Sequence, residues 1–289
     1  METGELIKKV RKIEIKTRGL SHNIFAGQYH SAFKGRGMSF SEVREYQYGD
    51  DVRDIDWNVT ARFNKPYIKV FEEERELTVM LMIDVSQSLS FGTVKQTKRD
   101  MLTEIAATIA FAAIQNNDKI GVIFFSDVIE KFIPPQKGRK HILYIIRELI
   151  NFEPTSQKTD ISVPLQFLTN AIKKRCTAFM LSDFIAEFNY RNAMTIANRK
   201  HDVVAVRVYD RRLEELPNVG LMKMLDAESG EEMYIDTSAS NVREAQRKWW
   251  KEQNAMLDEV LKKSRVDAVS VRTDGDYVKA LMSLFAMRA

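Results

Sequence analysis

The chain has 289 residues, 44% hydrophobic and 29% charged, which is typical of a globular protein with a core of normal size. Its 44 basic and 40 acidic residues nearly balance, and a net charge of +4 does not point to nucleic-acid binding. No apolar stretch approaches the roughly 20 residues of a membrane-spanning helix, and no secretion signal opens the chain, so we expect a cytoplasmic protein. Cys176 is the single cysteine, so we expect neither a disulfide nor a thiolate zinc site.

Residues 1–76 form an N-terminal segment with no regular alternation of strands and helices. It contains a short basic helical start, a glycine loop at 34–37 and a densely charged stretch at 41–57. No proline- or serine-rich linker follows, so we expect the segment to pack on the main domain as an appendage. Arginines alternate with aspartates in the charged stretch, which favours structural ion pairs over a two-metal hydrolase site. The residues concerned are Arg44, Asp50, Asp51, Arg53, Asp54, Asp56 and Arg62.

Residues 77–289 alternate between apolar runs of strand length and helical patterns with one apolar side. The predicted strands are 77–83, 120–125, 128–133, 177–181, 203–208 and 268–271. The predicted helices are 95–115, 140–150, 159–172, 190–200, 241–263 and 277–287, and residues 219–235 are predicted to form a β-hairpin insertion. This order predicts one α/β domain, with a doubly wound, mostly parallel sheet and helices on both faces.

The first predicted strand, 77–83, is followed by an aspartate and two serines spaced by two, Asp84, Ser86 and Ser88. Alternate residues of an extended chain point the same way, so these side chains are expected to converge beyond the carboxyl end of the strand. Ligands of open α/β sheets collect at that edge. A carboxylate and two hydroxyls are hard oxygen donors, which suit Mg²⁺ or Mn²⁺ rather than zinc.

Two further oxygen donors are expected at the same edge of the sheet. Thr159 opens a predicted helix after a loop, and Asp183 follows the strand 177–181. Each residue also has a simpler interpretation, because Thr159 or Asp183 could be a helix cap and the two serines could be turn residues. Five donors on one edge favour a metal site, in which a six-coordinate ion would keep one position for water or a partner's group.

This arrangement resembles the von Willebrand factor A-like fold, whose metal-ion-dependent adhesion site combines Asp-x-Ser-x-Ser with a threonine and a later aspartate. The resemblance covers roughly residues 78–289 and implies a six-stranded sheet with one antiparallel edge strand, which residues 128–133 would supply. It also implies that the three hydroxyls bind the ion directly and that the two aspartates act largely through water. Gln87 and Phe184 stand where glycine is common in that fold, and both could narrow the site.

The N-terminal segment is similar to the signature of the domain-of-unknown-function-58 family. The similar residues run from Arg44 to Trp57, through Thr60 to Arg62 and from Lys69 to Glu76, with Tyr48 in place of a usual proline. Many members carry membrane helices ahead of this signature, and this chain shows none. The resemblance implies a MoxR-type AAA+ ATPase as partner.

Two functions are compatible with these residues. The first is a non-enzymatic, metal-dependent protein-binding module, in which an Asp or Glu of a partner completes the coordination shell of the ion. Such a module would act as an adaptor or cofactor of the ATPase in protein assembly or maturation. The alternative is a metal-dependent phosphohydrolase with Asp84 as nucleophile. Against the alternative, Ser86 stands where a carboxylate general acid would be expected.

Overall fold

A computed structural model describes residues 39–72, 77–92, 96–156, 158–186, 189–225 and 232–288. The contacts divide the chain into two compact units, a small one that ends at Leu77 and a large one that begins at Thr78 in the described part. The predicted basic helix and the glycine loop at 34–37 lie outside the described residues.

The small unit is built on two antiparallel strands, β1 (Ser39–Glu45) and β2 (Tyr67–Glu72). Between them lie a 3-10 helix, η1 (Val52–Asp54), and a short helix, α3 (Trp57–Phe63). Both helices begin at an aspartate cap: the carboxylate of Asp51 accepts from the backbone of η1, and that of Asp56 accepts from two backbone N–H groups of α3.

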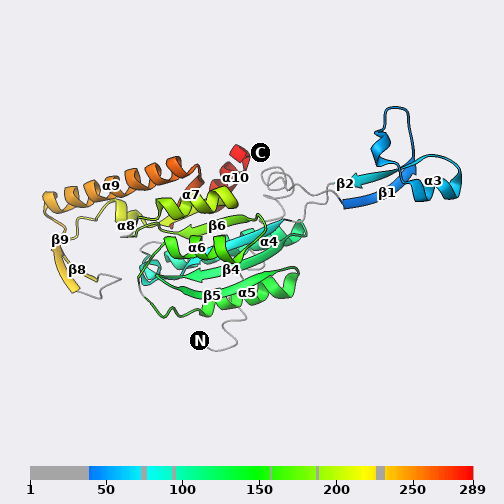
Figure 1. The fold of residues 1–289 in the computed structure, drawn as a ribbon. Helices are drawn as coiled ribbons and strands as arrows, with labels where there is room; N and C mark the ends of the chain where they lie inside the picture. The colour runs from blue at the N-terminus through cyan, green and yellow to red at the C-terminus, as the bar shows by residue number, and fades with distance from the viewer. Residues whose placement is uncertain are drawn as a thin grey trace. The chain divides into compact units, whose positions relative to one another are not determined.

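The large unit is a six-stranded sheet with helices on both faces, as the sequence predicts (Figure 1). The strand order is β10-β7-β6-β3-β4-β5, and β5 alone in this sheet is antiparallel to its neighbour. The strands are β3 (Thr78–Asp84), β4 (Lys119–Phe125), β5 (Ile129–Gln136), β6 (Thr177–Ser182), β7 (Asp202–Tyr209) and β10 (Asp267–Arg272). The antiparallel edge strand implied by the resemblance is therefore confirmed.

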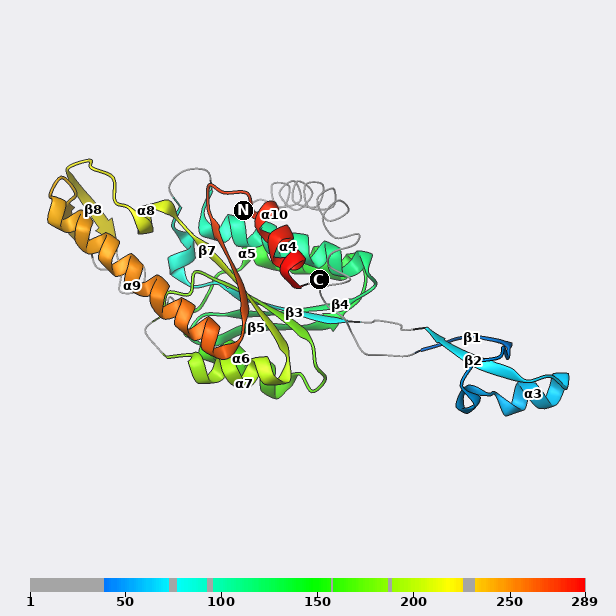
Figure 2. The same cartoon turned by 90° about the horizontal axis from the view of Figure 1, so that it is seen from above.

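The helices form two layers. The first contains α4 (Lys98–Gln115), α5 (Arg139–Asn151) and α10 (Tyr277–Arg288), and the second contains α6 (Ser162–Ala171), α7 (Arg191–Lys200) and α9 (Ser240–Ser264). Figure 2 shows these layers on opposite faces of the sheet. Alanines line much of α4, and their small side chains let this almost fully buried helix lie close to the central strands.

The large unit has further elements between β7 and α9 along the chain. They are a short helix, α8 (Arg211–Glu214), and two antiparallel strands, β8 (Leu221–Leu225) and β9 (Glu232–Asp236), in the segment where a hairpin is expected. Its predicted turn at Ser229 and Gly230 lies outside the described residues. No helix within the described ranges is long and apolar enough to cross a membrane.

The topology places the carboxyl ends of the central strands together. β3 lies between β4 and β6 and is parallel to both, so residues that follow these three strands meet at one edge. The core on either side is dense: the side chains of β3 from Val79 to Ile83 are almost completely buried. The loops at this edge therefore stand on a rigid base.

Candidate metal site

The Asp-x-Ser-x-Ser motif folds as a strand end followed by a tight turn. Asp84 is the last residue of β3, Ser86 is extended, and a 3-10 helix, η2 (Gln87–Ser90), begins directly after it. The three side chains meet, as the sequence predicts, but the chain is extended only as far as Ser86, so extension does not bring Ser88 to the other two. The turn does so instead: the Ser86 and Ser88 hydroxyl oxygens lie 3.1 Å apart, and the Ser86 backbone N–H donates to Oδ1 of Asp84 at 2.9 Å.

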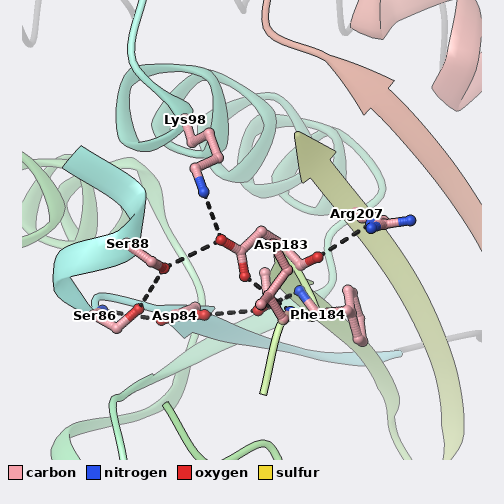
Figure 3. A network of polar contacts seen from close by, with 9 residues as sticks. Asp84, Ser86, Ser88, Lys98, Asp183, Phe184 and Arg207 are labelled. Atoms are coloured by element: carbon pink, nitrogen blue, oxygen red, sulfur yellow. Dashed lines mark hydrogen bonds and ion pairs between the residues drawn. The ribbon is translucent and has the colours of Figure 1, made fainter. Parts of the chain in front are cut away.

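The end of β6 supplies the opposite side of the site. The Ser88 hydroxyl donates to Oδ2 of Asp183 at 3.1 Å, and the Ser182 hydroxyl donates to Oδ2 of Asp84 at 2.6 Å (Figure 3). Asp183 is not a helix cap, because α7 begins only at Arg191. Four of the five residues predicted as ligands thus belong to one hydrogen-bonded cluster.

Two carboxylates lie close together in this cluster, away from water. Asp84 is 2% exposed and Asp183 is fully buried. Burial, and next the negative charge of Asp183, raise the pKa of Asp84 to about 6, although Ser182 and Ser86 stabilise its charged form by hydrogen bonds. A site with two buried carboxylates favours a positive charge beside them.

Thr159 lies at the same edge, one residue before a backbone contact with the end of β4. The Asp160 N–H donates to the carbonyl of Ser126 at 3.1 Å, and Val85, next to Asp84, donates to the carbonyl of Phe125 at 2.9 Å. Asp160, rather than Thr159, makes the capping contacts with Ser162 at the start of α6. Thr159 is therefore not the cap of α6.

Among the predicted ligands, the Thr159 hydroxyl is the one that makes no hydrogen bond within the described residues. The residue is 3% exposed, and its Oγ1 has no hydrogen-bond partner among the residues that the structure describes. A buried hydroxyl without a partner is costly, and native structures usually resolve it with a bound water or ion. This orphaned oxygen is the structural feature that fits a metal ligand best.

The structure adds a lysine that the sequence analysis does not identify. Lys98, the first residue of α4, points its ammonium group at Asp183, and Nζ lies 2.6 Å from Oδ2 (Figure 3). Both side chains are almost fully buried, with exposures of 3% and 0%. The site therefore already contains one cationic group. Lys98 and Asp183 lie 85 positions apart, so no local pattern in the sequence indicates their contact. The one indirect indication is a lysine at the start of a helix, where a positive charge is unfavourable.

On its other side, Asp183 is held by Arg207 of β7. Its Nε donates to the backbone carbonyl of Asp183 at 3.1 Å. The guanidinium lies over the ring of Trp250 in α9, with Cζ 4.5 Å from the ring centroid. The next residue, Phe184, has φ of 58°, which a bulky side chain rarely adopts. Its ring is buried near Tyr190, so here a packed side chain replaces the glycine that is common in the fold.

The donor set fits a hard divalent cation. Two carboxylates and three hydroxyls are all oxygen ligands, which Mg²⁺ and Mn²⁺ prefer. In the described part of the chain, no three His, Cys, Asp or Glu side chains group so as to hold a metal. The Lys98 ammonium beside Asp183 is the one feature that such a cation would have to accommodate.

Comparison with known proteins identifies the family. Residues 42–256 match the family described as "Protein of unknown function DUF58". The chain belongs to the DUF58 family. Relatives include "Uncharacterized protein Rv1480" of Mycobacterium tuberculosis and "Uncharacterized protein Mb1516" of Mycobacterium bovis, each 29% identical over 100% of this chain and 91% of its own length. "Uncharacterized protein YeaD" of Bacillus subtilis is 28% identical over 45% of this chain and 29% of its own length.

Solved structures with a similar fold share little sequence with this DUF58 protein. A conserved hypothetical protein, BatB, from Bacteroides thetaiotaomicron is 14% identical, with 73% of this chain and 98% of that chain covered and a TM-score of 0.49. The SpRpn10 VWA domain is 12% identical, with 74% and 95% covered and a TM-score of 0.40. The fold assignment rests on the strand order and not on these matches.

The charged DUF58 signature makes one of the predicted ion pairs. Arg44 contacts Asp50 through two hydrogen bonds of 2.7 and 2.8 Å, and this contact lowers the pKa of Asp50. Asp51 and Asp56 serve as the helix caps described above, and Asp56 also lies 3.7 Å from Lys69. These contacts support the structural interpretation of the signature.

Proposed function

We propose that this DUF58 protein is a non-enzymatic binding module, which uses a divalent ion, Mg²⁺ or Mn²⁺, to bind a protein partner. The proposed ligands are Asp84, Ser86, Ser88, Thr159 and Asp183. A divalent ion held there supplies an electrophilic position for a carboxylate of the partner. The observation that carries the proposal is the Thr159 hydroxyl, buried and unpartnered within the described ranges, at the edge where the other four residues form one cluster.

The proposed partner is a MoxR-type AAA+ ATPase, for which the protein would act as an adaptor or cofactor in protein assembly or maturation. Support for this partner comes from the family resemblance and not from any contact in the structure. The metal site supports the more general part of the proposal, which is recognition of a protein through an acidic side chain. The rim of the sheet offers the loops that such a partner would contact.

The geometry of Asp84 argues against the alternative, a phosphohydrolase. A phosphoryl-accepting carboxylate must reach its substrate with a free oxygen. Asp84 is 2% exposed, its Oδ1 accepts from the Ser86 N–H, and its Oδ2 accepts from the Ser182 hydroxyl. Both oxygens are therefore engaged by the protein, as expected of a residue that positions a ligand site.

The proposal is tested with the ATPase encoded in the same genome, purified and kept in Mg²⁺ throughout so that its own nucleotide site is unaffected. The Ser86→Ala/Ser88→Ala double variant is expected to weaken the affinity at least about tenfold, because two direct ligands are lost. A matched control is Ser238→Ala/Ser240→Ala, which removes two exposed serines of the same spacing. Equal affinity of wild type and the Ser86/Ser88 variant would refute metal-dependent recognition of this partner.

A further inference from the structure

We propose that the Lys98 ammonium is a built-in cation of the site, which makes binding of the divalent ion depend on the arrival of a partner's carboxylate. The inference rests on the proposed function, because it concerns the charge balance of the same site. Three observations lead to it: the burial of Lys98, the oxygen that it shares with Ser88, and the count of charges in the cluster.

The position of Lys98 is explained by the site and not by its helix. Lysine side chains are seldom fully buried unless they are paired. Lys98 lies in the first turn of α4, where the helix dipole disfavours a positive charge. The helix start is already stabilised by a capping box between Thr97 and Asp100. The contact with Asp183, buried on both sides, is what holds the ammonium there.

The ammonium shares one oxygen with a proposed metal ligand. Oδ2 of Asp183 accepts from Lys98 Nζ at 2.6 Å and from the Ser88 hydroxyl at 3.1 Å (Figure 3). A cation bound to Ser88, which is half-buried, would therefore lie near the ammonium and beside the almost fully buried side chains of Lys98 and Asp183. Like charges repel strongly where the effective dielectric constant is low, so Lys98 must weaken the binding of a bare divalent ion.

Counting formal charges shows what relieves this repulsion. With both carboxylates ionised, Asp84, Asp183 and Lys98 together carry a formal charge of −1, a divalent ion brings the site to +1, and one carboxylate from a partner returns it to zero. Without Lys98 the two aspartates would be neutralised by the ion alone, and a further carboxylate would add an uncompensated charge. Lys98 therefore converts the site from one satisfied by metal alone to one satisfied by metal and an acidic partner together.

The test measures Mn²⁺ binding at pH 8 by the electron paramagnetic resonance signal of free Mn²⁺, with a blocked glutamate peptide or its glutamine counterpart present. For wild type, the glutamate peptide is expected to tighten Mn²⁺ binding at least about tenfold, within the usual range of coupling between two ligands, and the glutamine peptide to have no effect. For Lys98→Met, Mn²⁺ alone should bind at least about tenfold tighter than to wild type, and the tightening by the glutamate peptide should be clearly smaller than in wild type.

Lys98→Gln serves as a second variant, because its neutral amide can still donate to Asp183. A matched control is Lys131→Met on β5, which breaks an ion pair of the same 2.6 Å length with Glu148 of α5 and is separated from β3 by strand β4. That control should bind Mn²⁺ as wild type does. If both Lys98 variants failed to fold, the absence of tightening by the glutamate peptide in wild type would still overturn the inference.

The outcomes separate this inference from the proposed function. Mn²⁺ binding to wild type that the glutamate peptide does not tighten, or equal affinities of wild type and Lys98→Met, would overturn the role of Lys98 and leave the metal site standing. No Mn²⁺ binding by any of these proteins, with or without peptide, or full binding by Ser86→Ala/Ser88→Ala, would overturn the proposed site itself and this inference with it.

Discussion

Replacing Thr159 by valine should have opposite effects on stability without and with magnesium. Valine keeps the shape of threonine and removes the hydroxyl, which is buried and lacks a hydrogen-bond partner in the described part of the chain. Because such a group costs about 1–3 kcal/mol, Thr159→Val should raise the free energy of unfolding by about 1 kcal/mol in EDTA. In Mg²⁺ at a hundredfold excess over Kd, wild type gains about 2.7 kcal/mol, and the variant should lose most of this gain.

The assay is urea denaturation followed by circular dichroism, in EDTA and in Mg²⁺, for wild type and Thr159→Val. Thr108→Val is a suitable control, since the Thr108 hydroxyl is equally buried and donates to the Glu104 carbonyl at 2.8 Å. The control should lose about 1 kcal/mol in both buffers. A loss of stability for Thr159→Val in EDTA would mean that the hydroxyl has a protein partner. An undiminished gain from Mg²⁺ would show that Thr159 is not a ligand.

Three further predictions concern buried groups near the site or the sheet. Asp183→Asn leaves the Lys98 ammonium without its carboxylate, so the free energy of unfolding should fall by about 3–5 kcal/mol and the melting temperature by on the order of 10 °C. A Lys98→Met/Asp183→Asn double variant should melt above Asp183→Asn, and additive losses would contradict this pairing. Phe184→Gly should be more stable than Phe184→Ala by about 1 kcal/mol in urea, because alanine keeps the strain of φ 58°; the reverse order would contradict it. Burial first, then the charges of Lys200 and Arg175, lower the pKa of His201 to about 4. Below about pH 6.5 the unfolded chain therefore binds more protons than the folded one. The free energy of unfolding should fall by up to about 3 kcal/mol between pH 6.5 and pH 4. Urea midpoints from pH 8 to 4 test this, and the same slope in His201→Asn would refute it.

The sequence was sufficient to predict the large unit because period and length of the apolar runs differ between its strands and helices. The run 77–83 is nearly continuous and apolar, as expected of a strand buried on both faces, and it became β3 (Thr78–Asp84). Boundaries were less certain: the helix predicted from residue 95 begins at Lys98, and the edge strand predicted to end at 133 continues to Gln136. The pattern of apolar residues does not determine at which residue a helix or strand begins or ends.

The site was predictable only as far as topology determines it. Parallel strands end at one edge, so Asp84 and Asp183 could be placed together from the order of elements alone. The sequence allows Ser86 and Ser88 as turn residues, but the 3-10 helix η2 could not be predicted, because the short run from Gln87 to Ser90 has no period of its own. Ser182 orients Asp84 by donating to its Oδ2. Its role depends on the register between β3 and β6, which no local pattern records.

Asp183 connects the site to three other parts of the fold, and this makes its charge more consequential than its position in the motif suggests. Its carboxylate receives Lys98 from α4 and Ser88 from η2, while its backbone carbonyl receives Arg207 from β7. Arg207 in turn lies over Trp250 of α9. A cation or a partner that weakens the ion pair between Lys98 and Asp183 therefore acts on a residue whose backbone is bound by Arg207. A lysine could not replace Arg207 here, since an ammonium group has no flat face to lie over an indole ring while it donates to the Asp183 carbonyl oxygen.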